Sequence, residues 1–503
     1  MLSQMNHPIA LHSGRLLAAL ALILGLGGLP LDAQAQANQE FRQWLAEQQS
    51  SFAAYRDQHD ADFARWLDEQ WVAFDTFVQR PPVEAPKPDA APVWQEPEST
   101  TPVPPVDDTP APITLEPPIV LPESAPEPAP AVPSPVAPST GQRLMLHYEG
   151  LRAELRFNQA LEGRLPTRVN DQAIADYWQV MSSWGGAEEV GRLVAELARR
   201  NNLNTYDQLL VMHSFAGQLV EREEAQTLLT WYLAVRQGLQ VRVGYDARSA
   251  YLLVATRQSQ YNVPYVTYQG VRFYAFSPEG RYPTGQLTSY SEQHRRASSF
   301  VELQPHPALN VGGTWEMEPI TIDMYGVDDY FQLPVNPALA RHFERYPQLS
   351  LQDYFAQPMP TPMRDALRTQ LLPRLQSLTL VEQANYLLRF AQFATGYMTD
   401  QEQFGQENYQ HPVESFTNGY NDCEDRALIF ALLVRDLLQV EVMALYFPGH
   451  VATALRLPPQ AGLGSTQVGN ATFYWADPSY LHATVGRLIP QVEGRTPQII
   501  GVP

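Results

Sequence analysis

The sequence predicts an α+β protein built from two tandem domains, each with helices packed on an antiparallel sheet. Two segments about 200 residues apart resemble each other, "TLLTWYLAVRQGLQVRV" at 227–243 and "ALIFALLVRDLLQVEV" at 427–442. In each copy helical patterns come first and strand-like runs follow, such as "VEVMALYF", "VATALRL" and "ATFYWAD" in the second copy. Helices segregated from a run of strands are typical of α+β domains with antiparallel sheets.

The first 37 residues have the features of an export signal. Arg15 precedes an apolar run from Leu16 to Leu29, and the small residues of "AQAQA" follow. The run is shorter than the roughly 20 apolar residues that span a bilayer. We expect cleavage near Ala35 or Ala37, a periplasmic or secreted protein and no stable membrane insertion. An uncleaved membrane anchor is the alternative.

Composition excludes several classes of function. The chain has 34 basic and 54 acidic residues and a formal net charge of -20, so it lacks the basic footprint of a nucleic-acid-binding protein. It has one cysteine, which cannot form an internal disulfide. No ligand spacing of the zinc kind is present, and we expect no metal and no cofactor.

Residues 38–80 predict an amphipathic helical segment. Phe41, Phe52, Phe63 and Phe74 recur every 11 residues, and another aromatic residue follows each of them three positions later. A period of 11 residues corresponds to about 3.67 residues per turn, which is close to the helical repeat. We expect a helix or helical hairpin that packs on the globular part. Docking on an envelope protein, or self-association, is the alternative.

Residues 81–140 predict a disordered linker, because they contain about twenty of the chain's 44 prolines. Such segments lack backbone donors, stay extended and do not pack, so proteases should cut this one readily. Globular composition begins near residue 141. The expected domains are 141–330 and 331–503.

The internal repeat supports a domain duplication. The tripeptide "LQV" begins at Leu239 and at Leu438, an offset of 199, and "FYAFSP" at 273–278 matches "FYWADP" at 473–478 with an offset of 200. Matches in the same order at nearly one offset indicate duplicated domains. We therefore expect helix 225–238 to be equivalent to helix 424–438.

Three residues of the second copy have the order of a nucleophile, a base and an orienting carboxylate. Cys423 directly precedes the helical run "EDRALIFALLVRDLL", and the N–H groups and dipole of a helix N-terminus favour a thiolate. His450 begins the strand "HVATAL", and Asp477 ends the strand "FYWAD". Adjacent strands lie about 4.8 Å apart, so the two side chains can meet. We predict a catalytic triad of Cys423, His450 and Asp477.

The segments "NDCEDRALIFALLVRDL", "PGHVATAL" and "WADPS" resemble the transglutaminase-like cysteine protease superfamily. The resemblance covers about 70 residues, with weaker support back to about residue 365. It implies a papain-like core in which the cysteine opens a helix packed on the sheet that carries the histidine and aspartate. It also implies acyl transfer through a thioester. Bacterial members often read G-D-C-E-D, and here Asn421 replaces the glycine. The replacement can be tolerated because asparagine also accepts left-handed backbone angles.

The first copy lacks the chemical groups of the second. The offsets place Glu224 at the position of Cys423, Tyr251 at that of His450 and Ser277 at that of Asp477. We therefore expect a degenerate transglutaminase-like domain suited to scaffolding or binding.

The expected function is an exported cysteine hydrolase or acyltransferase acting on protein or peptide amides, a peptidase where water resolves the thioester. If an amine attacks the thioester instead, the chain would be a transglutaminase that cross-links proteins. The rival is a non-catalytic envelope protein that uses both domains as interaction modules.

The sequence leaves the roles of several residues close to Cys423 in the chain undecided. Its backbone N–H is the expected oxyanion donor, and Gln410, Asn418 and Tyr420 are sequence neighbours considered for the second donor. Glu424 and Asp425 could complement the helix N-terminus, bind a cation or hold a loop. His411 could face substrate.

Overall fold

The computed structural model describes residues 60–81, 87–95, 142–157, 160–161, 165–166 and 168–502, together with the single residues 43 and 58. The expected signal peptide, the aromatic residues Phe41 and Phe52 and most of the proline-rich linker lie outside the described residues.

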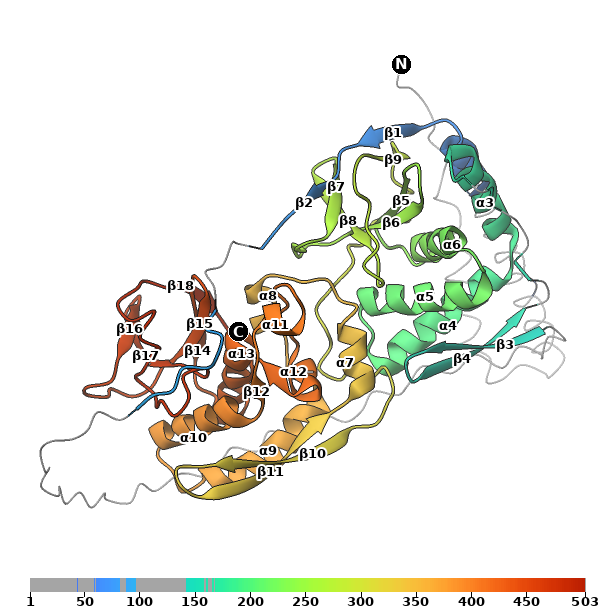
Figure 1. The fold of residues 1–503 in the computed structure, drawn as a ribbon. Coiled ribbons are helices and arrows are strands. Elements are labelled where there is room, and N and C mark those ends of the chain that lie inside the picture. Colours follow the sequence, from blue (N-terminus) through green and yellow to red (C-terminus); the bar gives the residue numbers. More distant parts are fainter. Residues whose placement is uncertain are drawn as a thin grey trace, which may run out of the picture.

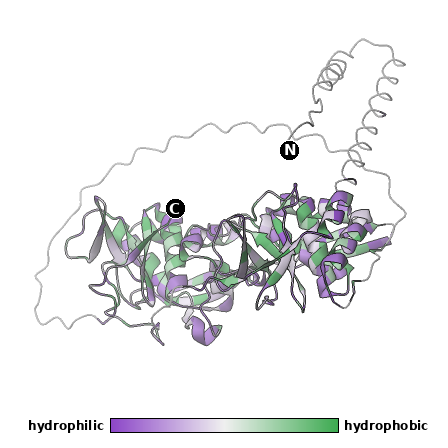
Figure 2. Cartoon of the chain, turned by 90° about the horizontal axis from the view of Figure 1, so that it is seen from above, coloured by the Kyte–Doolittle hydropathy of each residue, from purple (hydrophilic) through white to green (hydrophobic). Residues whose placement is uncertain are grey.

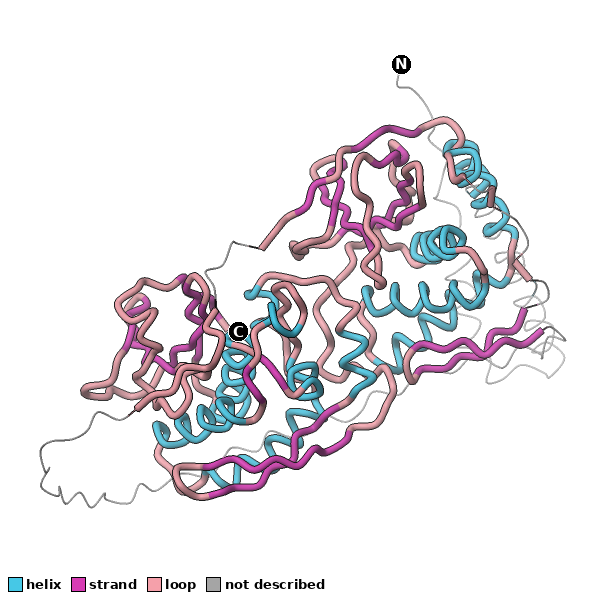
Figure 3. The backbone as a smooth tube through the Cα atoms, in the orientation of Figure 1, coloured by secondary structure: helices cyan, strands magenta, loops and turns pink. Residues whose placement is uncertain are grey.

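The described part of the chain forms two units, each with helices beside an antiparallel sheet (Figures 1 and 3). The first unit contains, in order, β3 (Gln142–Tyr148), β4 (Leu151–Phe157), α3 (Asp171–Ser183), α4 (Gly186–Asn201), α5 (Thr205–Leu219), α6 (Glu223–Arg236), β5 (Val241–Tyr245), β6 (Ala250–Ala255), β7 (Pro264–Tyr268), β8 (Val271–Phe276) and β9 (Leu287–Tyr290).

The second unit begins with the hairpin β10 (Glu316–Asp323) and β11 (Asp328–Val335). The expected domain boundary at 330/331 falls inside β11, so the hairpin extends the second unit toward the N-terminus. The helices and short strands that follow are α7 (Pro337–Phe343), α8 (Leu351–Phe355), α9 (Thr361–Leu375), α10 (Leu380–Phe393), β12 (Gly396–Tyr397), α11 (Asp400–Gln403), α12 (Pro412–Asn418), β13 (Tyr420–Asn421) and α13 (Cys423–Leu433).

A π-helical turn, Val434–Leu438, continues α13 into the second sheet. The strands of that sheet are β14 (Val442–Phe447), β15 (His450–Leu455), β16 (Ser465–Val468), β17 (Ala471–Ala476) and β18 (Gln498–Gly501).

The two sheets share one strand order. The second sheet runs β16-β17-β15-β14-β18, and the first contains the matching series β7-β8-β6-β5-β9, with all neighbours antiparallel. Helix α6 packs on β5 and β6 as α13 packs on β14 and β15. The α+β class and its antiparallel sheets are confirmed, and α6 and α13 occupy equivalent places.

The central helix α13 is buried on every side, because each of its eleven residues has less than a tenth of its surface exposed. A helix with this surrounding needs a continuous apolar run rather than a one-sided stripe, which is why "ALIFALL" follows its first turn. Figure 2 shows the same distribution, with hydrophobic residues (green) gathered on the inner strands and helices of both units.

The N-terminal segment differs from the expected helix over 38–80. Within its described part, residues 60–67 are helical, but β1 (Trp71–Phe74) and β2 (Phe77–Val78) are strands. They pair with β9 and β7 at the two edges of the first sheet. Aromatic and β-branched residues suit such strands, and the two available sheet edges override the helical spacing.

The helical part of this segment packs on its own chain. Phe63 lies 4.8 Å from the Trp178 ring and 5.9 Å from the Tyr290 ring, measured between ring centroids. Leu67 is fully buried. Residues 60–78 therefore cover part of the first unit.

We expect Leu67→Ala to lower the free energy of unfolding by about 3 kcal/mol, because it removes a fully buried side chain and leaves a cavity. Denaturant unfolding measures this change. Asp68→Ala, at the exposed next position, serves as the control and should change the value by less than about 0.5 kcal/mol. Equal effects of the two substitutions would show that the segment does not pack as described.

Candidate active site

Cys423 is the first residue of α13 and is almost fully buried, at 1% exposure. Asp422 precedes it as the N-cap residue, although its side chain makes no capping hydrogen bond. The expected place of the cysteine at a helix N-terminus is therefore present. The structure adds that solvent barely reaches the thiol.

His450 and Asp477 come together as the sequence predicts. His450 opens β15, Asp477 follows β17, and the His450 Nε2 atom lies 2.8 Å from Asp477 Oδ2. Ser479 donates its backbone N–H and its hydroxyl to Asp477 Oδ1, and Ile489 N–H donates to Oδ2. These donors fix the carboxylate, which in turn holds the imidazole with its proton on Nε2.

The other imidazole nitrogen, His450 Nδ1, is buried and has no hydrogen-bond partner among the described residues. With Nε2 protonated, Nδ1 carries a lone pair. Because α13 packs against β15, the cysteine helix and the histidine strand are direct neighbours.

The Cys423 thiol donates its hydrogen bond to a residue other than His450 in this structure. Cys423 Sγ donates to Glu424 Oε2 at 3.0 Å, and no hydrogen bond joins it to His450 in the described part of the chain. Burial, and then the charges of Glu424 and Asp422, raise the pKa of the Cys423 thiol well above its usual value. The thiol is therefore neutral in this arrangement.

Four carboxylates form an acidic cluster beside the thiol, which we define as Asp400, Glu407, Asp422 and Glu424. The Lys87 ammonium lies among them, 2.7 Å from Glu407 Oε1, 3.0 Å from Asp422 Oδ2 and 3.4 Å from Asp400 Oδ2, and it also contacts Glu424. Lys87 was not predicted as a site residue, because the proline content of residues 81–140 predicts an unpacked linker. Residues 87–95 instead pack on the second unit.

The amino-acid composition does single out Lys87. Of the 34 basic residues 33 are arginines, so Lys87 is the only lysine of the chain, just as Cys423 is the only cysteine. A lysine ammonium is a compact charge that can approach several carboxylates at once, which a planar guanidinium cannot do as closely.

The charges within the cluster are unequal. Burial alone would raise the pKa of Glu424, but the Lys87 ammonium and the hydrogen bonds that Glu424 accepts lower it to about 2. Burial, and then the charges of Glu424 and Asp422, raise the pKa of Asp400 far above its usual value. Lys87 and Glu424 are therefore the ion pair, and Asp400 stays protonated near neutral pH.

This arrangement predicts how stability depends on pH. An unfolded Asp carboxyl loses its proton near pH 3.9, whereas folded Asp400 keeps it, so the folded state binds more protons and the free energy of unfolding falls as pH rises above about 4. Asp400→Asn should remove this loss. At pH 8 we expect the free energy of unfolding of the variant to exceed that of the original chain by about 1 kcal/mol or more. The difference should shrink toward pH 4.

Urea unfolding at several pH values tests this expectation. Asp365→Asn, at an exposed carboxylate, is the matched control and should leave the pH dependence unchanged. Parallel pH curves for Asp400→Asn and the original chain would contradict the assignment.

Asn421 has a different role from the one expected. Its backbone lies in β13 and is not among the residues with positive φ, so left-handed angles do not explain it. Asn421 Oδ1 accepts from Thr395 Oγ1 at 2.8 Å and from Arg426 Nε at 3.0 Å. The asparagine thus fixes the chain just before Cys423 through its side chain.

Of the three neighbours of Cys423 considered as a second oxyanion donor, Gln410 and Asn418 donate to other groups, and the Tyr420 side chain is exposed. Gln410 Nε2 donates to Asp425 Oδ2 at 2.9 Å and to Tyr420 O at 3.2 Å, and Asn418 Nδ2 donates to Gln410 Oε1. Asp425 also accepts from Gln410 N–H, so it holds the loop before α12. Asn421 Nδ2 is a buried donor without a hydrogen-bond partner in the described residues.

His411 does not face a substrate surface. It is buried, stacks on the Phe343 ring with centroids 3.9 Å apart, and precedes α12 as its N-cap residue. Burial, and then the neighbouring His342, lower the pKa of His411 to about 3.

The corresponding trio of the first unit forms no common network. Glu224 accepts from Arg222, Tyr251 donates to Asp246, and Ser277 accepts from the backbone N–H of Arg281. Each of these bonds is local, and the trio lacks a histidine.

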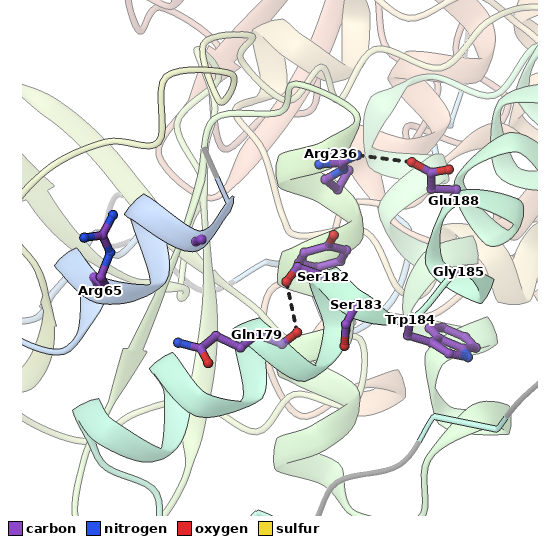
Figure 4. A pocket seen from close by; sticks show the side chains of 10 residues that line it. Arg65, Gln179, Ser182, Ser183, Trp184, Gly185, Glu188 and Arg236 are labelled. Carbon is purple, nitrogen blue, oxygen red and sulfur yellow. Dashed lines mark hydrogen bonds and ion pairs between the residues drawn. The ribbon is translucent and has the colours of Figure 1, made fainter. Parts of the chain in front are cut away.

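The first unit also has a hollow of about 590 Å³ (Figure 4). The hydroxyls of Ser182 and Ser183, at its rim, donate to backbone carbonyls of their own helix, and Arg236 pairs with Glu188. No histidine is among the described residues that line it. The hollow therefore lacks a histidine base, and Glu188, the acidic residue that lines it, is paired with Arg236.

No protein-family model, curated protein or solved structure matches this chain. Among the described residues, no helix is both long and apolar enough to cross a membrane.

Proposed function

We propose that the chain is an exported cysteine hydrolase or acyltransferase that cleaves protein or peptide amides, with a peptidase as its leading form. The second unit would be a transglutaminase-like catalytic domain with a papain-like core, and the first its degenerate copy. The observation that carries the proposal is the His450–Asp477 pair. Its imidazole keeps a buried Nδ1, without a partner among the described residues, on a strand packed against the helix that Cys423 opens.

The proposed reaction begins when the thiol leaves Glu424 and turns toward His450. Nδ1 takes the thiol proton, and the sulfur attacks the amide carbonyl carbon while the Cys423 N–H stabilises the oxyanion. The C–N bond then breaks, and the imidazolium gives its proton to the departing amine. A thioester remains on Cys423.

The thioester is resolved by a second nucleophile. A water molecule gives a proton to His450 and attacks the acyl carbon. The C–S bond then breaks, and the imidazolium returns the proton to the sulfur, which leaves a carboxylic acid and the free thiol. An amine in place of water would form a new amide, which is the transglutaminase form of the same chemistry. Asp477 keeps the imidazole oriented through both steps.

A second candidate function is a non-catalytic envelope module. The observation that favours it is the thiol's bond to Glu424, which together with the raised thiol pKa describes an unreactive cysteine. Under this candidate the cluster around Lys87 would serve only to anchor residues 87–95.

Comparison of envelope proteins from cells that carry the original chain or Cys423→Ala tests these functions. New protein termini that depend on Cys423 support the peptidase, and new cross-linked peptides that depend on it support the transglutaminase. Identical protein termini and cross-links in the two strains, with equal amounts of the chain, would favour the binding module.

A further inference from the structure

Residues 87–95 lie on the second unit as an added peptide strand would. Trp94 N–H donates to Leu481 O at 2.8 Å, and Leu481 N–H donates to Pro92 O at 2.8 Å, which makes a parallel bridge between Val93 and Leu481. Near the other end, the Tyr397 hydroxyl donates to Pro88 O at 3.0 Å. Backbone pairing combined with side-chain pockets is a common mode of peptide recognition. We call residues 87–95 the strap.

The strap connects the two sides of the candidate site. Lys87 enters the acidic cluster next to Cys423, whereas Val93 pairs with Leu481, four residues beyond Asp477. Between these anchors the chain continues through the exposed Asp89. A peptide substrate that reached both the thiol and the aspartate loop would need much of the same surface.

The C-terminal part of the strap has an apolar anchor. Trp94 packs against the apolar cluster on the outer face of the second sheet, and the Arg487 guanidinium lies 5.7 Å from its ring centroid. The cluster includes Met443, Leu445, Phe447, Tyr480 and Leu488. Trp94 is half-buried there, and aromatic anchors of this kind supply much of the affinity in peptide and protein interfaces.

The N-terminal part has a charged anchor. The Lys87 side chain is 7% exposed, and among the described residues it is the only basic side chain that pairs with Asp400, Asp422 or Glu424. The buried oxygens Asp400 Oδ1 and Asp422 Oδ1 have no hydrogen-bond partner there. The cluster therefore suits a compact cation with several N–H donors.

The ammonium and the Cys423 thiol contact the same carboxylate. Glu424 contacts Lys87 through Oε1 and accepts the Cys423 thiol through Oε2. Lys87 thus pairs with the carboxylate to which the Cys423 thiol donates in this structure.

We propose that the strap fills the substrate-binding surface of the proposed enzyme, and that the acidic cluster selects a primary ammonium side chain in a peptide substrate. This inference rests on the proposed function and names the substrate class of the same site. The substrate would be a peptide with a lysine-type side chain, and it would displace the strap to bind.

The ammonium in this cluster is a recognition group rather than an attacking amine. Burial would lower the pKa of Lys87, but the charges of Glu424 and its acidic neighbours outweigh burial and hold it well above its usual range. A protonated amine has no lone pair with which to attack a thioester. The cluster would therefore choose which peptide binds and would not supply the second nucleophile.

Binding of a peptide in trans provides the test. The strap acts at an effective concentration that reaches the millimolar range for short tethers, so it must first be weakened by Lys87→Ala with Trp94→Ala. Both the weakened and the original full chain carry Cys423→Ala, so that no turnover occurs. The probes are fluorescent acetyl-KPDAAPVWQ-amide and the same peptide with norleucine in place of lysine.

We expect the strap-weakened chain to bind the lysine peptide at least about tenfold more tightly than the norleucine peptide, with the original chain binding neither at the same concentrations. A chain with Asp89→Ala, exposed in the strap, should behave as the original chain does. Equal affinities for the two peptides, or no binding to a folded strap-weakened chain, would overturn the proposal. Stabilisation by calcium chloride without peptide binding would identify a metal site instead.

A second measurement covers the case in which the strap-weakened chain does not fold. Lys87 is the only lysine, so acylation of its amine by a small reagent in the original chain reports strap release at a single side chain. With the reagent in excess over all amines, and acylation read at Lys87 itself by mass spectrometry, excess lysine peptide should speed the acylation several-fold over the norleucine peptide, and equal rates would contradict the proposal. Neither measurement requires catalysis, so a failure of the proposed function remains distinguishable from a failure of this inference.

Discussion

Cys423→Ala should lower amide cleavage by at least about 10³-fold once a substrate is identified, because it removes the atom that forms the thioester. The loss should appear in kcat, while binding of a peptide substrate should change by less than about threefold. Steady-state kinetics and peptide binding together separate the two effects.

The matched variants for this prediction are His450→Gln and Asp477→Asn. Residues that act as one catalytic unit give losses that do not add, so a double variant with Cys423→Ala should be no slower than Cys423→Ala alone. A Cys423→Ala chain that retains more than about a tenth of the activity would show that another group performs the chemistry.

Arg426→Leu should lower the free energy of unfolding by about 3 kcal/mol or more, because buried hydrogen-bond acceptors lose a charged donor. Arg426 is 1% exposed and donates to Asn421 Oδ1, Gln392 O and Thr395 O, each at 3.0 Å. Its loss should also release the chain before Cys423 and slow any reaction of the thiol.

Arg456→Leu is the control for this second prediction. Arg456 is exposed and pairs with Glu441 at the surface, where an ion pair contributes little. Denaturant unfolding of the two variants should therefore differ by more than about 2 kcal/mol. A similar, small effect of both substitutions would mean that the Arg426 network does not stabilise the site.

The fold of the second unit could be predicted because its information is local. The apolar run after Cys423 needs a buried helix, and the alternating runs that begin at Val442 and His450 need strands. The His450–Asp477 contact follows from the pairing of neighbouring strands, which a short sequence separation favours.

Features that depend on distant pairing could not be predicted in the same way. Phe74 and Phe77 have helical spacing in the sequence, and they lie in strands because free sheet edges are available more than 180 residues away along the chain. Lys87 lies in a proline-rich region whose local composition gives no reason to pack. Its partners are more than 300 residues further along the chain.

The hydrogen bond from the Cys423 thiol to the Glu424 carboxylate was also not predicted. The sequence left three roles open for Glu424, namely complementing the helix N-terminus, binding a cation or holding a loop, and it could not show that Glu424 contacts both Lys87 and the thiol. Side-chain orientation in a buried charged cluster depends on every member of the cluster at once. One member, Lys87, was predicted to lie in an unpacked linker.

Alkylation of Cys423 by iodoacetamide tests the central claim most directly, because the chain has no second thiol to react. If His450 accepts the thiol proton, His450→Gln should slow labelling at pH 7 at least about tenfold relative to the original chain. His147→Gln, an exposed histidine far from the site in sequence, should leave the rate unchanged. Rates within about twofold for a folded His450→Gln chain and the original chain would contradict a Cys423–His450 catalytic pair.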